Sequence, residues 1–299
     1  MSRSWIERSW RSGHIGCTLL IMNRNEIEGW VRVVKESPSE GGRLGIYHRQ
    51  GDDQWVDLAL AYWQGKLNGL TLVESSGSSV VHKYRVTSDS LTCYIKRFLI
   101  RDWSDWIKHV VRMSRAKRAL IRGEEIQALG FSTPPALCLI EESRALIVRQ
   151  SALITEAIHD APNIREWLNR PHLGVARSIQ QKRQLLRALG REVGALHAAG
   201  FHHGDMRSTN ILCRSSRRGF TFFWLDNERT NKLPRLPMRL RAHNLTQLNM
   251  ERRGVTLTDR MRFWKTYLNE TDISPLQEQR TLRKVIRRSQ KRWKKRGWM

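Results

Sequence analysis

Apolar and polar positions alternate over short stretches in the first half of the chain, which is the pattern of β-strands. Five such stretches cover residues 70–73, 80–86, 91–99, 137–141 and 145–154. Residues 74–79, Glu-Ser-Ser-Gly-Ser-Ser, separate the first two stretches as a turn. Together these stretches predict a small antiparallel sheet.

Helical periodicity replaces this alternation in two longer stretches. One covers residues 103–129 and stops at Gly130, with Pro134 shortly beyond it. The other covers residues 181–199, places its leucines on one face and stops at Gly200. Strands followed by helices predict an α+β fold of two lobes, with a small N-terminal sheet lobe and a larger, mainly helical C-terminal lobe.

The first 65 residues differ from the rest of the chain. They are rich in Trp, Gly and Ser and carry turn signals at residues 41–42 and 51–53. We interpret them as an irregular, β-rich extension. The predicted organisation is therefore an extension over 1–65, an N-terminal lobe over 66–155, a C-terminal lobe over 156–279 and a basic helix or tail over 280–299.

Charge and cysteine content narrow the possible partners and the compartment. Lys and Arg number 53 against 28 Asp and Glu, and a net charge of +25 favours an anionic partner. The four cysteines form no Cys-x-x-Cys pair, so neither a zinc site nor a disulfide framework is indicated. The longest apolar run, residues 15–22, is too short to cross a bilayer. We expect a soluble or peripheral protein of the cytoplasm.

The strongest chemical signal lies in the segment Phe-His-His-Gly-Asp-Met-Arg-Ser-Thr-Asn-Ile-Leu at residues 201–212. It places Asn210 five residues after Asp205, which is the spacing of a kinase catalytic loop, between a helix and a strand. The next strand, over residues 220–225, returns through a tight hairpin and delivers Asp226 near the other two side chains. Three oxygen-bearing groups are thus predicted to converge.

Phosphoryl transfer needs this set of groups. A carboxylate orients the acceptor hydroxyl by accepting its proton, and hard oxygen ligands hold the metal ions that neutralise the triphosphate. We assign Asp205 as the catalytic base and Asn210 and Asp226 as ligands of Mg²⁺, with ATP as phosphate donor. The alternative is that these are ordinary turn residues, because Asp and Asn are favoured in turns.

Two upstream segments are candidates for contacts with the ATP phosphates. Lys96 lies in a strand, between Ile95 and Phe98, as the lysine that contacts the α- and β-phosphates does. Gly77 is the single glycine of the turn over 74–79, where a phosphate-covering loop belongs. A solvated strand lysine and a plain hairpin turn are the alternatives.

Further candidates are an acid and a hinge. Glu124 or Glu125, near the end of the helix over 103–129, could pair with Lys96, and we prefer Glu124, although surface acids are equally expected on a basic helix. The segment over 153–158 is similar to a hinge between lobes, where backbone groups of Glu156 and Ile158 would bind adenine. A plain buried strand is the alternative there.

Several segments together resemble the bacterial lipopolysaccharide kinase family, which includes heptose and Kdo kinases and InaA-like proteins. The resemblance rests on Tyr-Ile-Lys-Arg at 94–97, Gly-Phe-Ser-Thr-Pro at 130–134, Leu-Ile-Thr-Glu at 153–156, His-Gly-Asp-Met-Arg-Ser-Thr-Asn-Ile-Leu at 203–212 and Trp-Leu-Asp at 224–226, and it extends to the segment 240–249. It implies a bilobal protein-kinase-like fold, ATP with Mg²⁺, and phosphorylation of an inner-core lipopolysaccharide sugar at the cytoplasmic face of the inner membrane.

The sequence also departs from regulated protein kinases. Gly204 stands in place of the arginine of the catalytic loop, and Asn227-Glu228 replaces Phe-Gly after the metal-binding aspartate. Without that arginine, phosphorylation of a loop would have no charge partner here. These departures favour a constitutive kinase for a small molecule or glycolipid, and they leave open a protein kinase or a weakly active pseudokinase.

The last twenty residues, 280–299, hold ten Lys or Arg, and apolar residues recur among them at helical spacing. This pattern suits an anionic membrane surface. A solvated helix and a non-specific RNA-binding arm are the alternatives, and nucleic acid is the less favoured partner.

Overall fold

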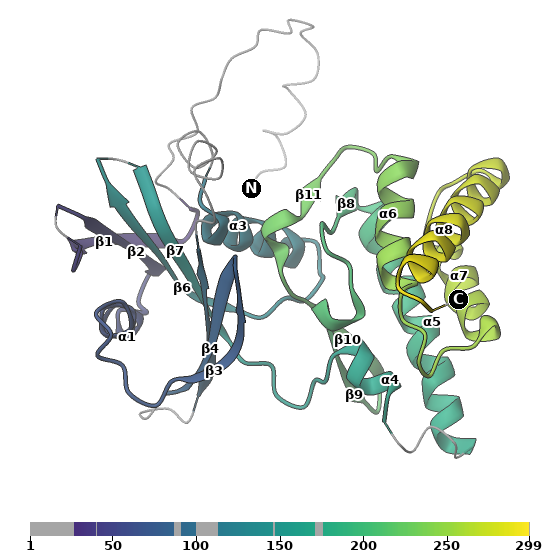
Figure 1. Ribbon diagram of the computed structural model, residues 1–299, viewed down its shortest axis with the longest axis horizontal. Helices are drawn as coiled ribbons and strands as arrows, with labels where there is room; N and C mark the ends of the chain where they lie inside the picture. The colour runs from purple at the N-terminus through teal and green to yellow at the C-terminus, as the bar shows by residue number, and fades with distance from the viewer. Residues whose placement is uncertain are drawn as a thin grey trace, which may run out of the picture.

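The computed structural model describes residues 27–39, 41–86, 91–99, 113–145, 147–170 and 176–298. It has a sheet lobe, formed by the earlier part of the chain, and a mainly helical lobe, formed by the later part (Figure 1). The predicted α+β class, with a small sheet lobe followed by a helical lobe, is confirmed.

A seven-stranded antiparallel sheet forms the N-terminal lobe, in the order β1-β2-β6-β7-β5-β4-β3. Its strands are β1 (Trp30–Glu36), β2 (Arg43–Arg49), β3 (Thr71–Ser76), β4 (Ser79–Arg85), β5 (Thr92–Phe98), β6 (Ala136–Arg144) and β7 (Ile147–Glu156). Each face of the sheet packs on a helix, α1 (Gln54–Trp63) on one and α3 (Arg115–Ala128) on the other. Strand alternation therefore decides which side chains face the rest of the molecule.

The alternating direction of side chains along β5 and β7 determines the face of the sheet on which Lys96 lies. Ile95 and Ile154 are fully buried against the α1 side of the sheet. The next residues along each strand point to the opposite face, where Leu153 packs with the α3 cluster. Because Lys96 is the cross-strand partner of Leu153, its side chain shares that face.

The described part of the N-terminal 65 residues is not a separate extension. Strand β1 pairs with β2, and β2 pairs with β6, so residues from Ile27 onward are part of the sheet lobe. The β-rich character expected for this segment is present, but the strand pattern in the sequence is weak for physical reasons. The edge strand β1 is mostly exposed, and β2 is buried on both faces over Leu44 to His48, so neither has the period of a half-buried strand.

The predicted helix over 103–129 is described only in part. Helix α3 begins at Arg115, after Ser114, whose hydroxyl accepts a hydrogen bond from the Lys117 amide at 3.0 Å. This is an N-cap contact, which satisfies one of the free amides at a helix start. The predicted part before residue 113 lies outside the described residues.

The C-terminal lobe is built on one apolar core, which includes Leu185, Leu189, Phe201 and Trp224. Its elements are α4 (Ile164–Leu168), α5 (Ala176–Ala198), β8 (Phe201–His202), η2 (Ser208–Asn210), β9 (Ile211–Ser216), β10 (Gly219–Trp224), η3 (Asn227–Arg229), β11 (Asn231–Lys232), α6 (Met238–Leu248), α7 (Leu257–Asn269) and α8 (Pro275–Lys295).

Most of the predicted basic helix or tail over 280–299 lies in helix α8. The predicted boundary at residue 280 falls inside it, and its buried residues Thr281, Val285 and Ser289 recur every four positions. Ser289 accepts a hydrogen bond from Asn249 at 2.8 Å, which fastens α8 to the end of α6. Among the described residues, no helix is both long and apolar enough to span a membrane.

Candidate active site

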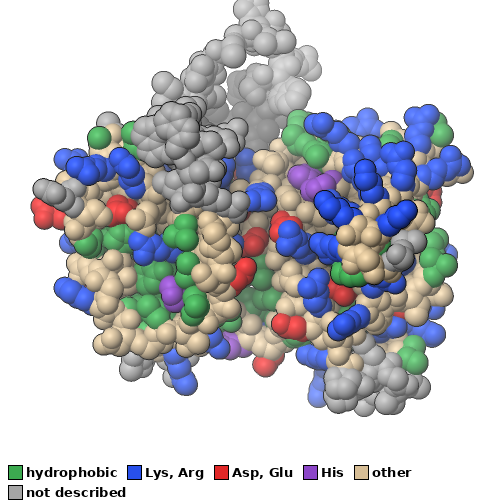
Figure 2. All heavy atoms as spheres, in the orientation of Figure 1, with side chains coloured by type: hydrophobic (Ala, Val, Ile, Leu, Met, Phe, Trp, Pro, Cys, Tyr) green, Lys and Arg blue, Asp and Glu red, His purple; other side chains and the backbone are tan. Residues whose placement is uncertain are grey.

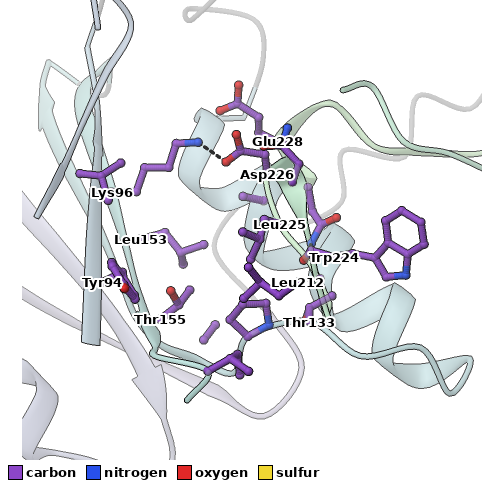
Figure 3. Close-up of a pocket in the computed structure, with 18 of the residues that line it drawn as sticks. Tyr94, Lys96, Thr133, Leu153, Thr155, Leu212, Trp224, Leu225, Asp226 and Glu228 are labelled. Atoms are coloured by element: carbon purple, nitrogen blue, oxygen red, sulfur yellow. Dashed lines mark hydrogen bonds and ion pairs between the residues drawn. The ribbon is translucent and has the colours of Figure 1, made fainter. Parts of the chain in front are cut away.

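A cavity of about 690 Å³ lies between the two lobes and contains most of the predicted site residues. Figure 3 shows part of its lining, including Lys96 and Asp226. Its walls come from β5, β7 and α3 on one side, and from the loop around η2 and the end of β10 on the other. Seven of the eight predicted residues line it: Lys96, Glu124, Glu156, Ile158, Asp205, Asn210 and Asp226. The eighth, Gly77, lies at the turn between β3 and β4 and is not among the lining residues.

His203 connects the catalytic loop to the strand that carries Asp226. Its Nδ1 accepts a hydrogen bond from the Asp205 amide at 3.2 Å, so Nε2 carries the proton and donates to the Leu225 carbonyl at 2.8 Å. The ring is fully buried, and burial lowers its pKa, which keeps the imidazole neutral in this arrangement. His203 thus fixes the spacing between Asp205 and Asp226.

Asp205 is held on several sides but remains accessible from the cavity. Asn210 donates from Nδ2 to the Asp205 carbonyl at 2.9 Å and to Oδ2 at 3.2 Å. Arg207 Nε lies 2.7 Å from Asp205 Oδ1, and the Asp205 side chain keeps 21% of its exposure. A carboxylate held in this way can accept a proton from a hydroxyl that enters the cavity.

Two side chains of α6 support the catalytic loop, and sequence reasoning assigned them no role. Asn244 is fully buried, accepts from the His203 amide at 3.2 Å and donates to the His203 carbonyl. Gln247 accepts from the Met206 amide at 3.1 Å and donates to Asp205 Oδ1 at 3.3 Å. The signal that could have found them is the family-like segment 240–249, which contains both.

Lys96 and Asp226 form an ion pair across the cavity, from β5 to the end of β10 (Figure 3). The pair brings the predicted lysine to the predicted metal ligand. Asp226 has a left-handed backbone with φ 59°, which is uncommon for a residue with a side chain and occurs often at functional sites. Lys96 also lies over the Phe98 ring, 5.3 Å from its centroid.

The predicted pairing of Glu124 with Lys96 is wrong. Glu124 Oε1 accepts from Arg49 Nη2 at 2.7 Å instead, while Lys96 binds Asp226. The physical reason is β2, which brings Arg49 close to α3 and was not recognised as a strand. Glu125, the other candidate, pairs with Arg122 on its own helix at 2.6 Å.

Glu228 is a further acid of the cavity wall, to which the sequence analysis assigns no function. Its side chain is 8% exposed and accepts two hydrogen bonds from the Arg115 guanidinium, from Nη2 at 2.8 Å and from Nε at 3.1 Å. Arg115 also donates to the Ser78 carbonyl at 2.8 Å and lies over the Phe98 ring. One half-buried arginine therefore joins α3, the β3–β4 turn and η3 of the other lobe.

We expect Arg115→Met to destabilise the protein by about 3 kcal/mol, because it leaves the Glu228 carboxylate, which is 8% exposed, with only the longer 3.6 Å ion pair to the exposed Arg229. Adding Glu228→Leu should restore most of that loss, since an apolar pair of similar volume needs no compensating charge. Urea unfolding of the two variants measures this. Arg122→Met is the matched control on the same helix, and removing its half-exposed pair with Glu125 should cost less than about 1 kcal/mol. Equal losses for Arg115 and Arg122 would contradict the assignment.

The hinge candidates Glu156 and Ile158 both line the interlobe cavity. The Glu156 amide is already bonded to the Pro135 carbonyl at 2.9 Å, and the Ala157 amide to the Thr92 carbonyl at 2.9 Å. Among the described residues, the Ile158 amide has no backbone acceptor. The groups left to bind a ligand at this edge are therefore the Ile158 amide and carbonyl oxygens, because the Glu156 amide is occupied.

Gly204, which replaces the arginine of regulated kinases, sits where no side chain fits. A Cβ at this position would lie 2.2 Å from Arg229 Cβ and 2.5 Å from the Arg229 carbonyl oxygen. The backbone of η3 thus packs directly on the catalytic loop. The glycine is required by this contact, so the lost arginine and the altered Asn227-Glu228 sequence are two parts of one packing arrangement.

The donor groups fit a hard cation bound together with phosphate. Asn210 uses its Nδ2 toward Asp205, which leaves its Oδ1 free, and Asp226 has a second carboxylate oxygen beyond the one that meets Lys96. Oxygen ligands of this kind suit Mg²⁺, which takes few protein ligands and completes its shell with phosphate and water. No group of three His, Cys, Asp or Glu among the described residues could hold a metal by itself.

The family model for lipopolysaccharide kinases, described as the lipopolysaccharide kinase (Kdo/WaaP) family, matches residues 64–267 of the chain. The protein belongs to that family. The matched segment contains every predicted site residue, from Gly77 to Asp226. Family membership supports phosphotransfer from ATP as the general activity, and the resemblance found in the sequence is confirmed.

A solved structure agrees with this assignment. The chain entitled "WaaP in complex with acyl carrier protein" matches with a TM-score of 0.58 and 20% identity, over 82% of this chain and 98% of that one. At this identity the match shows that the protein has the WaaP kinase fold, and it shows the fold alone. A search of curated sequences gives no significant match.

Proposed function

We propose that this protein transfers the γ-phosphate of ATP to a sugar hydroxyl of the lipopolysaccharide inner core, a heptose or Kdo. The observation that carries the proposal is the convergence of Lys96, Asp205, Asn210 and Asp226 in one interlobe cavity, in a chain of the lipopolysaccharide kinase family. Each group has the chemistry that phosphoryl transfer requires, and each is positioned by hydrogen bonds or an ion pair.

The geometry supports one role for each of these groups. Asp205 accepts the proton of the sugar hydroxyl, Lys96 contacts the phosphates of ATP, and Asn210 and Asp226 hold Mg²⁺. The metal would supply neutralisation of the charge that builds up on the phosphate oxygens. Ile158 and the carbonyl of Glu156 bind adenine at the edge of β7. His203, Asn244 and Gln247 keep the loop in place while the acceptor enters.

The electrostatic surroundings of Asp205 favour an acceptor that carries negative charge. Arg207 lies against the base, and burial together with Arg292 and Arg288 lowers the pKa of the nearby His243 imidazole. These cations would attract a carboxylated or phosphorylated sugar more than a neutral one. Kdo and phosphorylated heptose both satisfy this requirement.

The test is a transfer assay with purified protein, ATP, Mg²⁺ and inner-core oligosaccharide, with a mixed protein acceptor in parallel. We expect the oligosaccharide to gain one phosphate by mass spectrometry, and its position on heptose or Kdo follows from fragmentation. Phosphate on the protein acceptor alone would instead favour a protein kinase. Normal nucleotide binding without any transfer would favour a non-catalytic relative that binds membrane or RNA.

Helix α8 supports the proposal that this kinase works at an anionic membrane surface. Its buried side packs on α6, and Lys and Arg side chains gather over this part of the molecule (Figure 2). No ion pair within the described residues neutralises any of them; the exposed cations are Arg280, Arg283, Arg287, Lys291, Arg292, Lys294, Lys295 and Arg296. Each cation near a charged bilayer contributes on the order of 1 kcal/mol of attraction.

Replacing Arg283, Arg287 and Lys291 by Gln should lower the affinity for anionic vesicles about a hundredfold, because three attractive charges are lost. Co-sedimentation with the vesicles measures this affinity. Neutral vesicles are the reference. Unchanged sedimentation would contradict a membrane role for α8, and a loss of RNA binding in the same variant would support the RNA-binding alternative.

A further inference from the structure

A second hollow lies away from the interlobe cavity, between α5 and the turn of the β9–β10 hairpin. It has a volume of about 430 Å³, and four arginines line it: Arg187 and Arg191 from α5, and Arg217 and Arg218 from the turn. None of its lining residues belongs to the interlobe cavity. Because β9 has six residues at about 3.3 Å each, the turn lies roughly 20 Å from the catalytic end of the hairpin.

The four arginines have no acidic partners among the described residues. All four are exposed, and within the described residues none of their guanidinium groups has a hydrogen bond or ion pair. No Asp or Glu lines the hollow. Four like charges around one small space repel each other, which disfavours the folded state unless an anion enters. By contrast, Arg207 and Arg115 at the interlobe cavity are both paired with carboxylates.

The other lining groups narrow the chemistry of the anion. Arginine presents a planar fork that binds two phosphate oxygens at once. Gln181 and Gln184 add amides, and Ser215 adds a hydroxyl; none of these side chains has a hydrogen-bonding partner within the described residues, so they can bind hydroxyl groups. The half-buried Phe220 supplies an apolar wall suited to the C–H face of a sugar ring.

We propose that this hollow binds a saccharide that carries two phosphate groups, one held by the α5 arginines and one by the turn arginines. This site goes beyond the proposed kinase function, because binding here requires neither ATP nor Asp205. It also places a phosphosaccharide on the same lobe as the catalytic loop, at the opposite end of the hairpin that carries Asn210 and Asp226.

The test compares two double variants of equal charge. Arg187→Gln with Arg217→Gln removes one arginine from each side of the hollow. Arg85→Gln with Arg149→Gln removes two exposed arginines from the sheet lobe and is the matched control. Calorimetric titration with fructose 1,6-bisphosphate should show binding that is at least about tenfold weaker in the first variant and unchanged in the control. Fructose without phosphate should bind to neither.

Thermal unfolding of the same samples checks that the fold is intact, and Arg191→Gln with Arg218→Gln provides a second variant of the hollow if the first does not fold. The ligand could be the headgroup of a lipid or a free phosphosugar, and phosphatidylcholine vesicles that contain a bisphosphorylated disaccharide lipid distinguish the two. Vesicle binding lost only in the hollow variants identifies a lipid headgroup, and loss confined to the soluble probe identifies a free phosphosugar. The proposal is overturned if the hollow variants bind both probes like wild type, or if the control loses as much affinity as they do.

Discussion

Asp205→Asn is expected to lower the rate of phosphate transfer by about three orders of magnitude while leaving ATP affinity close to that of the unchanged protein. The amide keeps the shape of the carboxylate, and its one oxygen can still accept from Arg207, while Asn210 keeps its hydrogen bond to the backbone carbonyl of residue 205. It cannot take up the proton of the acceptor hydroxyl. The loss should therefore appear in kcat and not in the dissociation constant for nucleotide.

Single-turnover transfer to inner-core oligosaccharide measures the chemical step, and calorimetric titration measures nucleotide binding. Asp272→Asn is the matched control, because Asp272 is exposed and has no ion pair among the described residues. It should transfer phosphate at the unchanged rate. If Asp205→Asn retained most of its activity, Asp205 would not be the base, and the catalytic role of the loop would have to be abandoned.

Gly204→Ala should lower the free energy of unfolding by about 3 kcal/mol, which is the upper range for forcing extra volume into a packed site. The added methyl would lie 2.2 Å from Arg229 Cβ and 2.5 Å from a backbone oxygen, and backbone cannot rotate away as the end of a side chain can. The loop or η3 must shift. Since η3 begins directly after Asp226, transfer activity should fall together with stability.

Denaturant unfolding gives the stability loss, and Gly77→Ala is its matched control. No atom lies within 4 Å of a Cβ at position 77, so that variant should unfold at an unchanged denaturant concentration. A Gly204→Ala variant as stable as the Gly77→Ala variant would show that the catalytic loop and η3 separate easily. The same outcome would remove the packing explanation for the missing arginine.

The catalytic centre could be predicted because its decisive spacings are short. Asp205 and Asn210 are five residues apart, and a single hairpin brings Asp226 back beside them, so local rules of turn and strand suffice. Lys96 was found for a related reason, because strand alternation alone fixes the face of the sheet on which it lies. In each case one secondary-structure element determines the geometry.

The errors arose where distant elements meet. Glu124 is bound by Arg49, which lies 75 positions away on a strand that carries no alternating pattern. The contact between Arg115 and Glu228 spans 113 positions, and each residue alone looks like an ordinary surface charge. Such pairs depend on how the lobes dock, which propensities and periodicity do not encode.

The ion pair between Lys96 and Asp226 has an energetic consequence for ligand binding. These two groups neutralise each other, so neither presents an unpaired charge to the cavity. A nucleotide without metal must draw Lys96 away from Asp226. The Asp226 carboxylate then faces the nucleotide phosphates, and the negative charges repel each other. A nucleotide with its metal offers Lys96 a phosphate and Asp226 a metal ion, so both groups keep a partner of opposite charge. We therefore expect the cavity to bind a nucleotide with its metal more tightly than the free nucleotide.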